Sequence, residues 1–241
     1  MSRSFVFRSL RALAFLLPVL SSAGESRAEE AQPHAVVVGS SSVRGSLGKL
    51  IEADLERKGY RVDRLGIVGA GLARPDFRDM QAEAKKLPVD GNTAVVFVYL
   101  GVNDGQTIWL EPEERQRPGD RWLRWNDPRW SVVYRRRAQR FLDTLCQRGA
   151  RQVIVMLPVE VLRPRLERRL HRIRALQQQA AERTSCASAL ATTRDESEPM
   201  VDASTRRPDG IHLTPLGADL VWQRVKRRAA AMLPSVGKWA H

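Results

Sequence analysis

The sequence predicts an α/β fold in which a parallel sheet of about five strands lies between two layers of helices. Short runs rich in Val and Ile alternate along the chain with longer segments in which apolar residues recur at helical spacing. The short runs are apolar throughout, which is typical of strands that helices bury on both faces. Regular alternation of strand and helix favours parallel strands over hairpins.

The predicted elements follow one another in a simple order. The strands comprise residues 35–39, 61–68, 93–100 and 152–157, and residues 200–202 could add a short fifth. The helices comprise residues 47–58, 130–148, 164–183 and 215–233. Gly59 and Gly149 follow the first two helices, in the position where glycine commonly ends a helix. Since parallel sheets of this kind bind ligands beyond the carboxyl ends of their strands, we expect functional residues in the loops there.

Two segments interrupt the alternation. Residues 105–129 form a long insertion after the third strand, and long loops in compact domains often carry function. Residues 185–207 are polar, and we expect them to be irregular and exposed.

The N-terminus has the three-part build of a secretory signal peptide. A basic stretch precedes a short apolar run, and the segment ends in a small-x-small pattern formed by Ser26 and Ala28. The apolar run is too short to span a membrane and contains Pro18, which disfavours the alternative of an uncleaved anchor. We expect cleavage of residues 1–28, with Ala23 as a second cleavage point, and a single periplasmic or secreted domain over residues 29–241.

The chain is strongly basic, with a formal net charge of +13. Such a surface favours anionic polymers, anionic membranes or nucleic acid, but an arginine-rich composition with solvated side chains is the better explanation of the charge. The basic segment 164–183 carries an apolar stripe that indicates a solvated outer helix. Because an exported protein meets little nucleic acid, we expect no nucleic-acid partner and possible contact with anionic polymers of the cell envelope.

Cysteine and histidine usage limits the chemistry further. Cys146 and Cys186 could form a disulfide in an oxidising compartment, or remain buried thiols. The four histidines are scattered, and their spacing fits no metal site. We expect neither a metal nor another cofactor.

Four short motifs occupy the loops in which this fold predicts function. They are Gly39-Ser40-Ser41-Ser42 after the first strand, Gly69-Ala70-Gly71-Leu72 after the second, Gly101-Val102-Asn103-Asp104 after the third, and Asp209-Gly210-Ile211-His212 before the last helix. Neither a phosphate-binding loop nor a dinucleotide-binding fingerprint can be fitted to the glycine-containing stretches.

Asp209 and His212 are three residues apart, so one turn of chain can present both side chains together. The carboxylate can hold one imidazole nitrogen while the other nitrogen removes the proton of a serine hydroxyl. Taken alone, the pair is better explained as a helix cap beside a surface histidine. Together with the three other motifs, it indicates a catalytic pair.

The order and setting of the four motifs resemble those of the SGNH (GDSL-type) hydrolase superfamily, whose blocks supply Ser, Gly, Asn and His. The resemblance spans nearly all of residues 29–241. It implies a three-layer, flavodoxin-like α/β/α fold and a serine esterase that needs no cofactor. Ser41 would be the nucleophile, His212 the base, and Asp209 the residue that orients the base.

The resemblance also assigns the oxyanion hole to the N–H groups of Ser41 and Gly71 and to the amide of Asn103. Gly71 is favoured over Gly69 because residues 71–76 resemble the Gly-Leu-x-Arg-Pro-Asp of one exported branch of the superfamily. The serine block is the least faithful, since Ser40 stands where the superfamily usually has aspartate.

The tryptophans of the insertion suggest a substrate class. Trp109, Trp122 and Trp125 could stack on sugar rings while Arg74 contacts an acidic group, or the tryptophans could form a small core under the loop. We expect removal of a small acyl group, such as acetyl, from a hydroxyl of a cell-envelope carbohydrate. The alternatives are an O-acyltransferase with the same triad, and an inactive glycan-binding or assembly protein that retains the fold.

Overall fold

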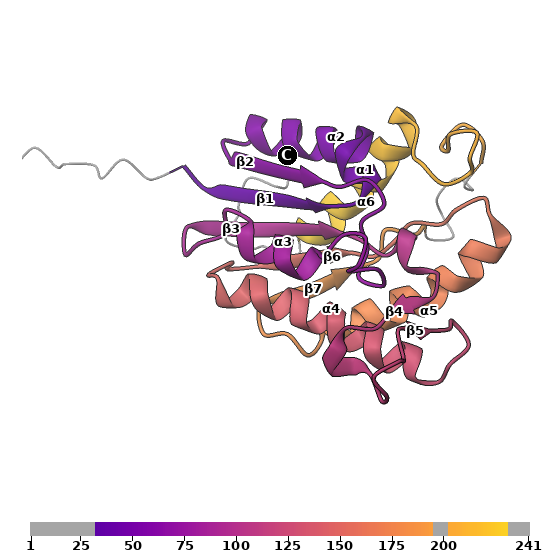
Figure 1. Cartoon of the computed structure of the whole chain (residues 1–241). Coiled ribbons are helices and arrows are strands. Elements are labelled where there is room, and N and C mark those ends of the chain that lie inside the picture. Colours follow the sequence, from indigo (N-terminus) through magenta and orange to yellow (C-terminus); the bar gives the residue numbers. More distant parts are fainter. Residues whose placement is uncertain (1–31, 195–201, 231–241) are drawn as a thin grey trace, which may run out of the picture. The chain divides into compact units, whose positions relative to one another are not determined.

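A five-stranded parallel sheet forms the centre of the computed structural model, which describes residues 32–194 and 202–230 (Figure 1). The strand order is β2-β1-β3-β6-β7, and every pairing is parallel. The strands are β1 (His34–Gly39), β2 (Arg61–Gly66), β3 (Thr93–Tyr99), β6 (Val153–Met156) and β7 (Ala187–Leu190). This is the flavodoxin-like order, in which the chain crosses in opposite directions from β1 and from β3 and leaves a crevice between their ends.

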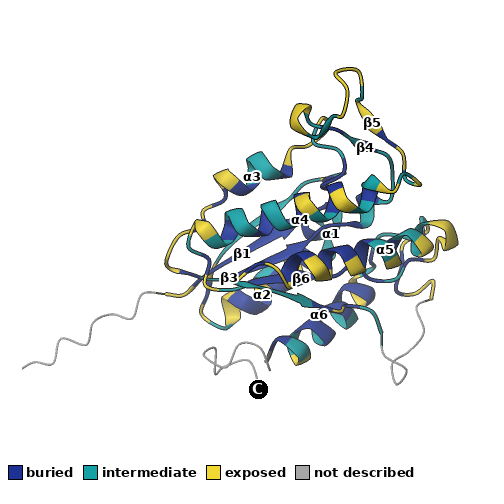
Figure 2. Ribbon diagram, turned by 90° about the horizontal axis from the view of Figure 1, so that it is seen from below, coloured by how far each residue is buried: buried dark blue, intermediate teal, exposed yellow. Residues whose placement is uncertain are grey.

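Two layers of helices cover the sheet (Figure 1). On one face, α2 (Ser46–Arg57) and α6 (Pro215–Ala230) surround the buried Trp222, whose ring meets that of Phe97 edge-on at 5.5 Å. On the other face lie α3 (Met80–Lys86), α4 (Arg129–Gln147) and α5 (Pro164–Ala181). Figure 2 shows that both layers bury their inner sides and expose their outer sides. The predicted three-layer α/β/α fold is confirmed.

The insertion at residues 105–129 folds as a small appendage on the second layer. It contains the antiparallel pair β4 (Ile108–Trp109) and β5 (Trp122–Leu123), and the 3₁₀ turn η2 (Pro112–Glu114). Ile108, Leu110 and Leu123 are buried and join the main core. The insertion is therefore anchored by its own apolar side chains, as the interpretation of a core under the loop requires.

The main differences from the expected elements concern the fifth strand and a helix between β2 and β3. The fifth strand is β7, within the segment expected to be irregular, whereas Asp202 lies outside any strand and residues 200–201 lie outside the described residues. β7 escapes detection because it is a short edge strand of small residues, Ala-Ser-Ala-Leu. Helix α3 was also not expected; it has seven residues and begins after Asp79, whose carboxylate accepts the N–H of Ala82 at 2.9 Å.

Cys146 and Cys186 form a disulfide that joins the end of α4 to the start of β7. The expected signal peptide, residues 1–28, lies outside the described residues, as do residues 231–233 of the last predicted helix. Within residues 32–194 and 202–230, no helix combines the length and apolar character that crossing a bilayer requires.

Candidate active site

The first three motifs meet at the carboxyl edge of the sheet because their strands are neighbours. β1 lies between β2 and β3, and Gly39 at its end pairs with both Gly66 and Tyr99. A side chain at Gly39 has no room, since a Cβ there would lie 2.3 Å from the carbonyl oxygen of Tyr99. The chain turns directly after this contact into the short helix α1 (Ser41–Arg44), so Ser41 lies between the loops that follow β2 and β3.

Ser41 is hydrogen-bonded to His212, which is 171 residues away in sequence. The Ser41 Oγ lies 2.9 Å from Nε2 of His212, and Nδ1 of His212 lies 2.5 Å from Oδ2 of Asp209. The side chain of His212 is 43% exposed and that of Asp209 is 41% exposed, so a solute can reach the imidazole directly. Serine, imidazole and carboxylate thus form one continuous chain of hydrogen bonds in the order used for nucleophilic acyl transfer.

The Asp209 carboxylate is held in its ionised form. Burial alone would raise its pKa, but the His212 ring and the backbone N–H groups of Ile211 and His212 lower the pKa to about 2. Those N–H groups donate to Oδ1 at 2.8 and 2.9 Å, which leaves Oδ2 for the imidazole. A carboxylate fixed in this way keeps Nδ1 protonated and Nε2 available as an acceptor from Ser41.

Residues that sequence reasoning missed hold the Asp209–His212 turn in place. Arg163, at the start of α5, donates from Nε to the carbonyl oxygen of Asp209 at 2.7 Å. The N–H of Leu162 donates to the carbonyl of Gly210 at 2.8 Å, and the N–H of Arg207 donates to that of His212 at 2.7 Å. Nothing in the local sequence marks Arg163 for this role, because the contact joins segments 46 residues apart.

Ser40 is fully buried behind the nucleophile. Its N–H donates to the carbonyl of Tyr99 at 3.2 Å. Although Ser40 occupies the N-cap position of α1, its hydroxyl makes no capping hydrogen bond. Ser42 lies within α1 and Ser46 is the first residue of α2, where polar residues commonly begin a helix. Of the three neighbouring serines, Ser41 is the one that the structure places against His212.

The loop after β2 brings Gly71 close to the Asn103-Asp104 pair. Nδ2 of Asn103 donates to the carbonyl of Ala70 at 2.8 Å, which uses one hydrogen of the amide and leaves the other. Oδ1 of Asp104 accepts the N–H of Ala73 at 2.8 Å. A Cβ on Gly71 would lie 2.3 Å from that same oxygen, which explains the glycine. No acceptor in the described part of the chain takes the N–H of Gly71 or of Ser41.

Asp104 is a wholly buried carboxyl group beneath this loop. Burial raises its pKa to about 6, although the N–H groups of Ala73 and Leu72, the Tyr134 hydroxyl and the charge of Arg137 all act to lower it. The Tyr134 hydroxyl donates to Oδ2 at 2.9 Å and accepts from Nε2 of Gln177 at 3.0 Å. Helices α4 and α5 therefore support the loop from below through one polar network.

The proposed substrate-binding residues divide into two groups. Trp109 and Trp122 are opposite each other in the β4–β5 pair, and the Arg74 guanidinium lies 4.9 Å from the centre of the Trp122 ring. Trp122 is 51% exposed, so part of its ring is free for a ligand. Trp125 packs instead against Trp130, and the guanidinium groups of Arg169 and Arg172 lie 5.1 and 4.9 Å from the centre of its ring, so protein groups already contact this partly buried ring.

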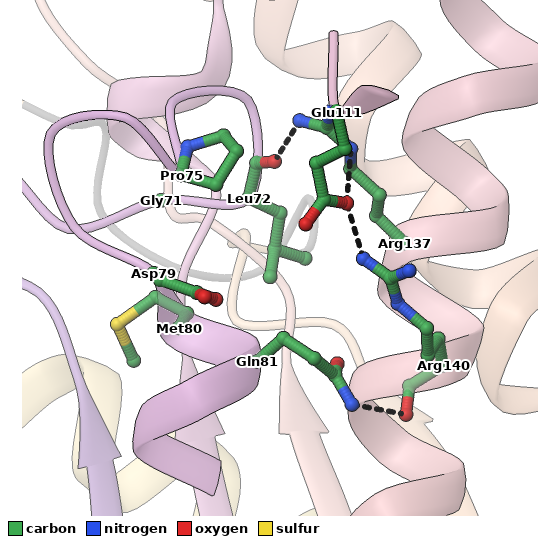
Figure 3. A pocket seen from close by; sticks show the side chains of 9 residues that line it. All are labelled: Gly71, Leu72, Pro75, Asp79, Met80, Gln81, Glu111, Arg137 and Arg140. Carbon is green, nitrogen blue, oxygen red and sulfur yellow. Dashed lines mark hydrogen bonds and ion pairs between the residues drawn. The ribbon is translucent and has the colours of Figure 1, made fainter. Parts of the chain in front are cut away.

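Figure 3 shows a small pocket beside the Gly71 loop. Its lining includes Gly71, Leu72, Glu111, Arg137 and Arg140, but neither Ser41 nor His212. Arg137 donates to the carbonyl of Leu72 at 2.8 Å, and Arg140 pairs with Glu111 at 2.5 Å. This pocket therefore lies where α4 supports the Gly71 loop, and it is not the reacting site. Within the described residues, no group of three His, Cys, Asp or Glu side chains could hold a metal ion.

Residues 34–228 match the family described as "Protein of unknown function (DUF459)". The comparison with curated proteins gave no match. Among solved structures, the lipase/acylhydrolase from Enterococcus faecalis is similar with a TM-score of 0.58 and 15% identity, covering 83% of this chain and 96% of that chain.

Two further solved structures are named for carbohydrate substrates. A carbohydrate esterase family 3 protein from Talaromyces cellulolyticus has a TM-score of 0.54 and 10% identity over 84% of this chain and 99% of that one. An acetylxylan esterase from Geobacillus stearothermophilus has a TM-score of 0.53 and 16% identity over 87% and 96%. At these identities the likeness concerns the fold. Since the family match covers most of the chain and the fold agrees, the chain belongs to the DUF459 family, within the SGNH (GDSL-type) hydrolase superfamily.

Proposed function

We propose that the protein is a serine esterase that removes small acyl groups through an acyl-enzyme. The observation that carries this proposal is the hydrogen-bond chain from Ser41 through His212 to Asp209. Serine is a weak nucleophile at neutral pH and needs an adjacent base, and the base needs a third group to fix its tautomer. The Asp209 carboxylate, with a pKa of about 2, is ionised throughout the neutral range.

In the acylation step, Ser41 Oγ attacks the ester carbonyl carbon while His212 Nε2 takes the hydroxyl proton. The carbonyl oxygen becomes negatively charged in the tetrahedral intermediate. His212 then gives its proton to the departing alcohol, and the carbon–oxygen bond of the ester breaks. Water repeats the sequence on the acyl-enzyme, with His212 again as the base, and releases the acid and free Ser41.

The developing oxyanion needs fixed hydrogen-bond donors, and we assign this role to three groups in the segments that follow β1, β2 and β3. The N–H groups of Ser41 and Gly71 have no acceptor among the described residues, and Asn103 retains one amide hydrogen after its bond to Ala70. Donors fixed before the reaction stabilise the transition state without a cost of reorganisation during it. Free donors in these segments are what the proposed oxyanion hole requires.

An acetyl ester of a carbohydrate is the substrate class that we propose. The exposed Trp122 ring offers an apolar face for a sugar, and Arg74, whose guanidinium is paired with Asp76 at 2.8 Å, lies beside that ring. Neighbours in fold are named as a carbohydrate esterase and an acetylxylan esterase. We also propose that the protein is exported through its N-terminal segment and acts on a cell-envelope carbohydrate.

Hydrolysis of p-nitrophenyl acetate tests the reaction class. We expect the Ser41→Ala variant to lose about 10³-fold or more in kcat, because no other group can form the acyl-enzyme. Ser42→Ala is the matched control, since it removes the next hydroxyl of the same helix, and it should retain wild-type turnover. Equal rates for wild type and Ser41→Ala would remove the esterase proposal and leave the inactive binding protein. Loss of turnover in Ser42→Ala alone would reassign the nucleophile.

The substrate class requires a second assay with the same variants. We expect release of free acetate from an O-acetylated oligosaccharide and none from the corresponding N-acetylated one, since the amide is the harder bond to break. Acetate that appears on an added sugar instead of in solution would identify the acyltransferase alternative. Turnover of the aryl ester without any release from O-acetylated oligosaccharides would contradict the carbohydrate assignment.

A further inference from the structure

Hydrogen bonds hold the backbone of three of the four residues in the segment 70–73. The carbonyl of Ala70 accepts from Asn103, and that of Leu72 from Arg137 at 2.8 Å. The carbonyl of Ala73 accepts from the N–H of Trp109 at 3.0 Å, and its N–H donates to Asp104. Within the described residues, Gly71 is the one member of this segment without a hydrogen bond. The loop is thus fixed on both sides of the Gly71 N–H, which is the one donor that this segment supplies to the proposed oxyanion hole.

Asp104 stands at the centre of this arrangement. Its Oδ1 lies against Gly71, where a Cβ would be 2.3 Å away, and it accepts the N–H of Ala73 at 2.8 Å. Its Oδ2 accepts from the hydroxyl of Tyr134, which is also completely buried. One carboxylate therefore joins the Gly71 loop to helix α4. Asp104 does not itself reach the triad in any hydrogen bond of the described residues.

We propose that Asp104 is a positioning residue that holds the Gly71 N–H in the oxyanion hole by clamping the 70–73 loop to α4. This inference rests on the proposed esterase function. It assigns the aspartate of the Gly-Val-Asn-Asp motif a task separate from that of Asn103. Small displacements matter for such a donor, because electrostatic stabilisation depends on a distance of about 3 Å to the oxyanion.

The clamp needs the ionised carboxylate. A protonated Asp104 would direct its hydrogen at the Tyr134 oxygen, which already accepts from Gln177, and the hydroxyl would have to turn away. The other groups that face the carboxylate are the N–H groups of Leu72 and Ala73 and, from α4, the Arg137 guanidinium. Because the loop contact and the α4 contact share one carboxylate, protonation weakens their connection.

Stability and activity depend on pH in opposite senses at this residue. Folding raises the pKa of Asp104 from its usual 3.8 to about 6, so the folded state favours the protonated form. The stability that this group contributes is present below pH about 4 and is lost as the pH rises through 6. The clamp, by contrast, is present above pH 6 and lost below it. An ionised buried carboxylate that costs stability at neutral pH is typical of a functional position.

The test measures kcat and KM for p-nitrophenyl acetate from pH 5 to 8 in wild type, Asp104→Asn and Tyr134→Phe. We expect Asp104→Asn to lower kcat by roughly tenfold to a hundredfold with little change in KM, somewhat less than outright loss of an oxyanion donor. In wild type, part of the fall of kcat towards acid pH (the acid limb of the profile) should come from protonation of Asp104. That part should be absent from the pH profile of Asp104→Asn. Tyr134→Phe should move that limb to higher pH, because the Tyr134 hydroxyl lowers the pKa of Asp104.

Asp54→Asn is the matched control. Asp54 is also a buried carboxylate, which accepts from Nε1 of Trp222 at 2.9 Å on the opposite face of the sheet. We expect this variant to lose thermal stability but to keep the wild-type kcat and pH profile. Wild-type kcat in Asp104→Asn, or an unshifted limb in Tyr134→Phe, would overturn the clamp.

The outcomes also separate the clamp from the function on which it rests. If wild-type turnover requires Ser41 and Asp104→Asn keeps it in full, only the clamp fails. If wild type and Ser41→Ala are equally inactive, the esterase proposal fails, and the positioning role is refuted with it. A loss of kcat that Asp54→Asn shares to the same extent would show a general effect of stability and would refute the clamp.

Discussion

Gly71 shows how much a single missing Cβ can matter at a reacting site. The position needs no unusual backbone angle, since its φ does not lie in the left-handed region. Glycine is required because the Asp104 carboxylate occupies the space that a side chain would take. The glycine of the motif Gly-Leu-Ala-Arg-Pro-Asp is therefore explained by a contact between residue 71 and Asp104, which are more than 30 positions apart in the sequence.

At this scale we predict that Gly71→Ala lowers kcat for p-nitrophenyl acetate by about 10²-fold or more. The new Cβ would lie 2.3 Å from Oδ1 of Asp104, so either the loop or the carboxylate must move and the N–H moves with it. Gly91→Ala is the control, because a Cβ there meets nothing within 4 Å. Steady-state kinetics of both variants decide the point, and unchanged kcat in Gly71→Ala would refute the assigned donor.

Among the elements, helix α4 contributes most to support without contributing a reacting group. Its Tyr134 reaches Asp104, and its Arg137 donates to the carbonyls of Leu72 and Trp109 and pairs with Glu114. Helix α4 thus binds both the Gly71 loop and the insertion, and so fixes their positions relative to each other. At its other end, Cys146 is joined to Cys186 ahead of β7. That end lies at the amino edge of the sheet, away from the triad.

We predict that the disulfide stabilises the fold without affecting the reaction. The two cysteines are 40 residues apart, and closing a loop of this length removes about 4 kcal/mol of unfolded-chain entropy on the loop-closure account. The double variant Cys146→Ala/Cys186→Ala should therefore lose about 2–4 kcal/mol in the free energy of unfolding, measured with denaturant. Its kcat/KM at 25 °C should equal that of wild type. A large change in kcat/KM would show that the amino edge communicates with the site.

The charge of the whole molecule adds a long-range preference to this local chemistry. The chain carries a formal net charge of +13. The exposed Arg44 and Arg207 lie close in sequence to Ser41 and Asp209, respectively. A strongly positive surface raises the local concentration of anionic solutes and speeds their encounter with the protein. Salt weakens this effect, because the screening length falls to about 8 Å at physiological ionic strength.

We predict that kcat/KM for an acetyl ester that carries a carboxylate falls as ionic strength rises, whereas kcat/KM for a neutral acetyl ester stays constant. Comparing O-acetylated oligosaccharides with and without uronic acid units between about 10 mM and 500 mM salt measures the effect. The neutral substrate is the internal control for general salt effects on the enzyme. Identical salt dependence for the two substrates would show that the net charge has no part in substrate capture.

The sequence by itself determined the sheet, its helical layers and the loops that carry function. Parallel strands that are buried on both faces appear in the sequence as unbroken apolar runs. Helices that bury one face show apolar residues at helical spacing. Together with the resemblance, these patterns predict Ser41, His212 and Asp209 as the catalytic residues. They misplaced the fifth strand, because the short edge strand β7 has little apolar surface to reveal it.

Only the tertiary structure decided which polar groups meet. It joined Ser41 to His212 across 171 residues, paired the two cysteines, and packed Trp125 against Trp130 while leaving Trp122 exposed. It also revealed Asp104, Tyr134 and Arg137 as the support of the Gly71 loop. Hydrogen bonds between distant segments depend on where packing brings their atoms, within a few tenths of an ångström. Composition and periodicity show which faces of a helix or strand are buried, but they do not show which polar groups of distant segments come into contact.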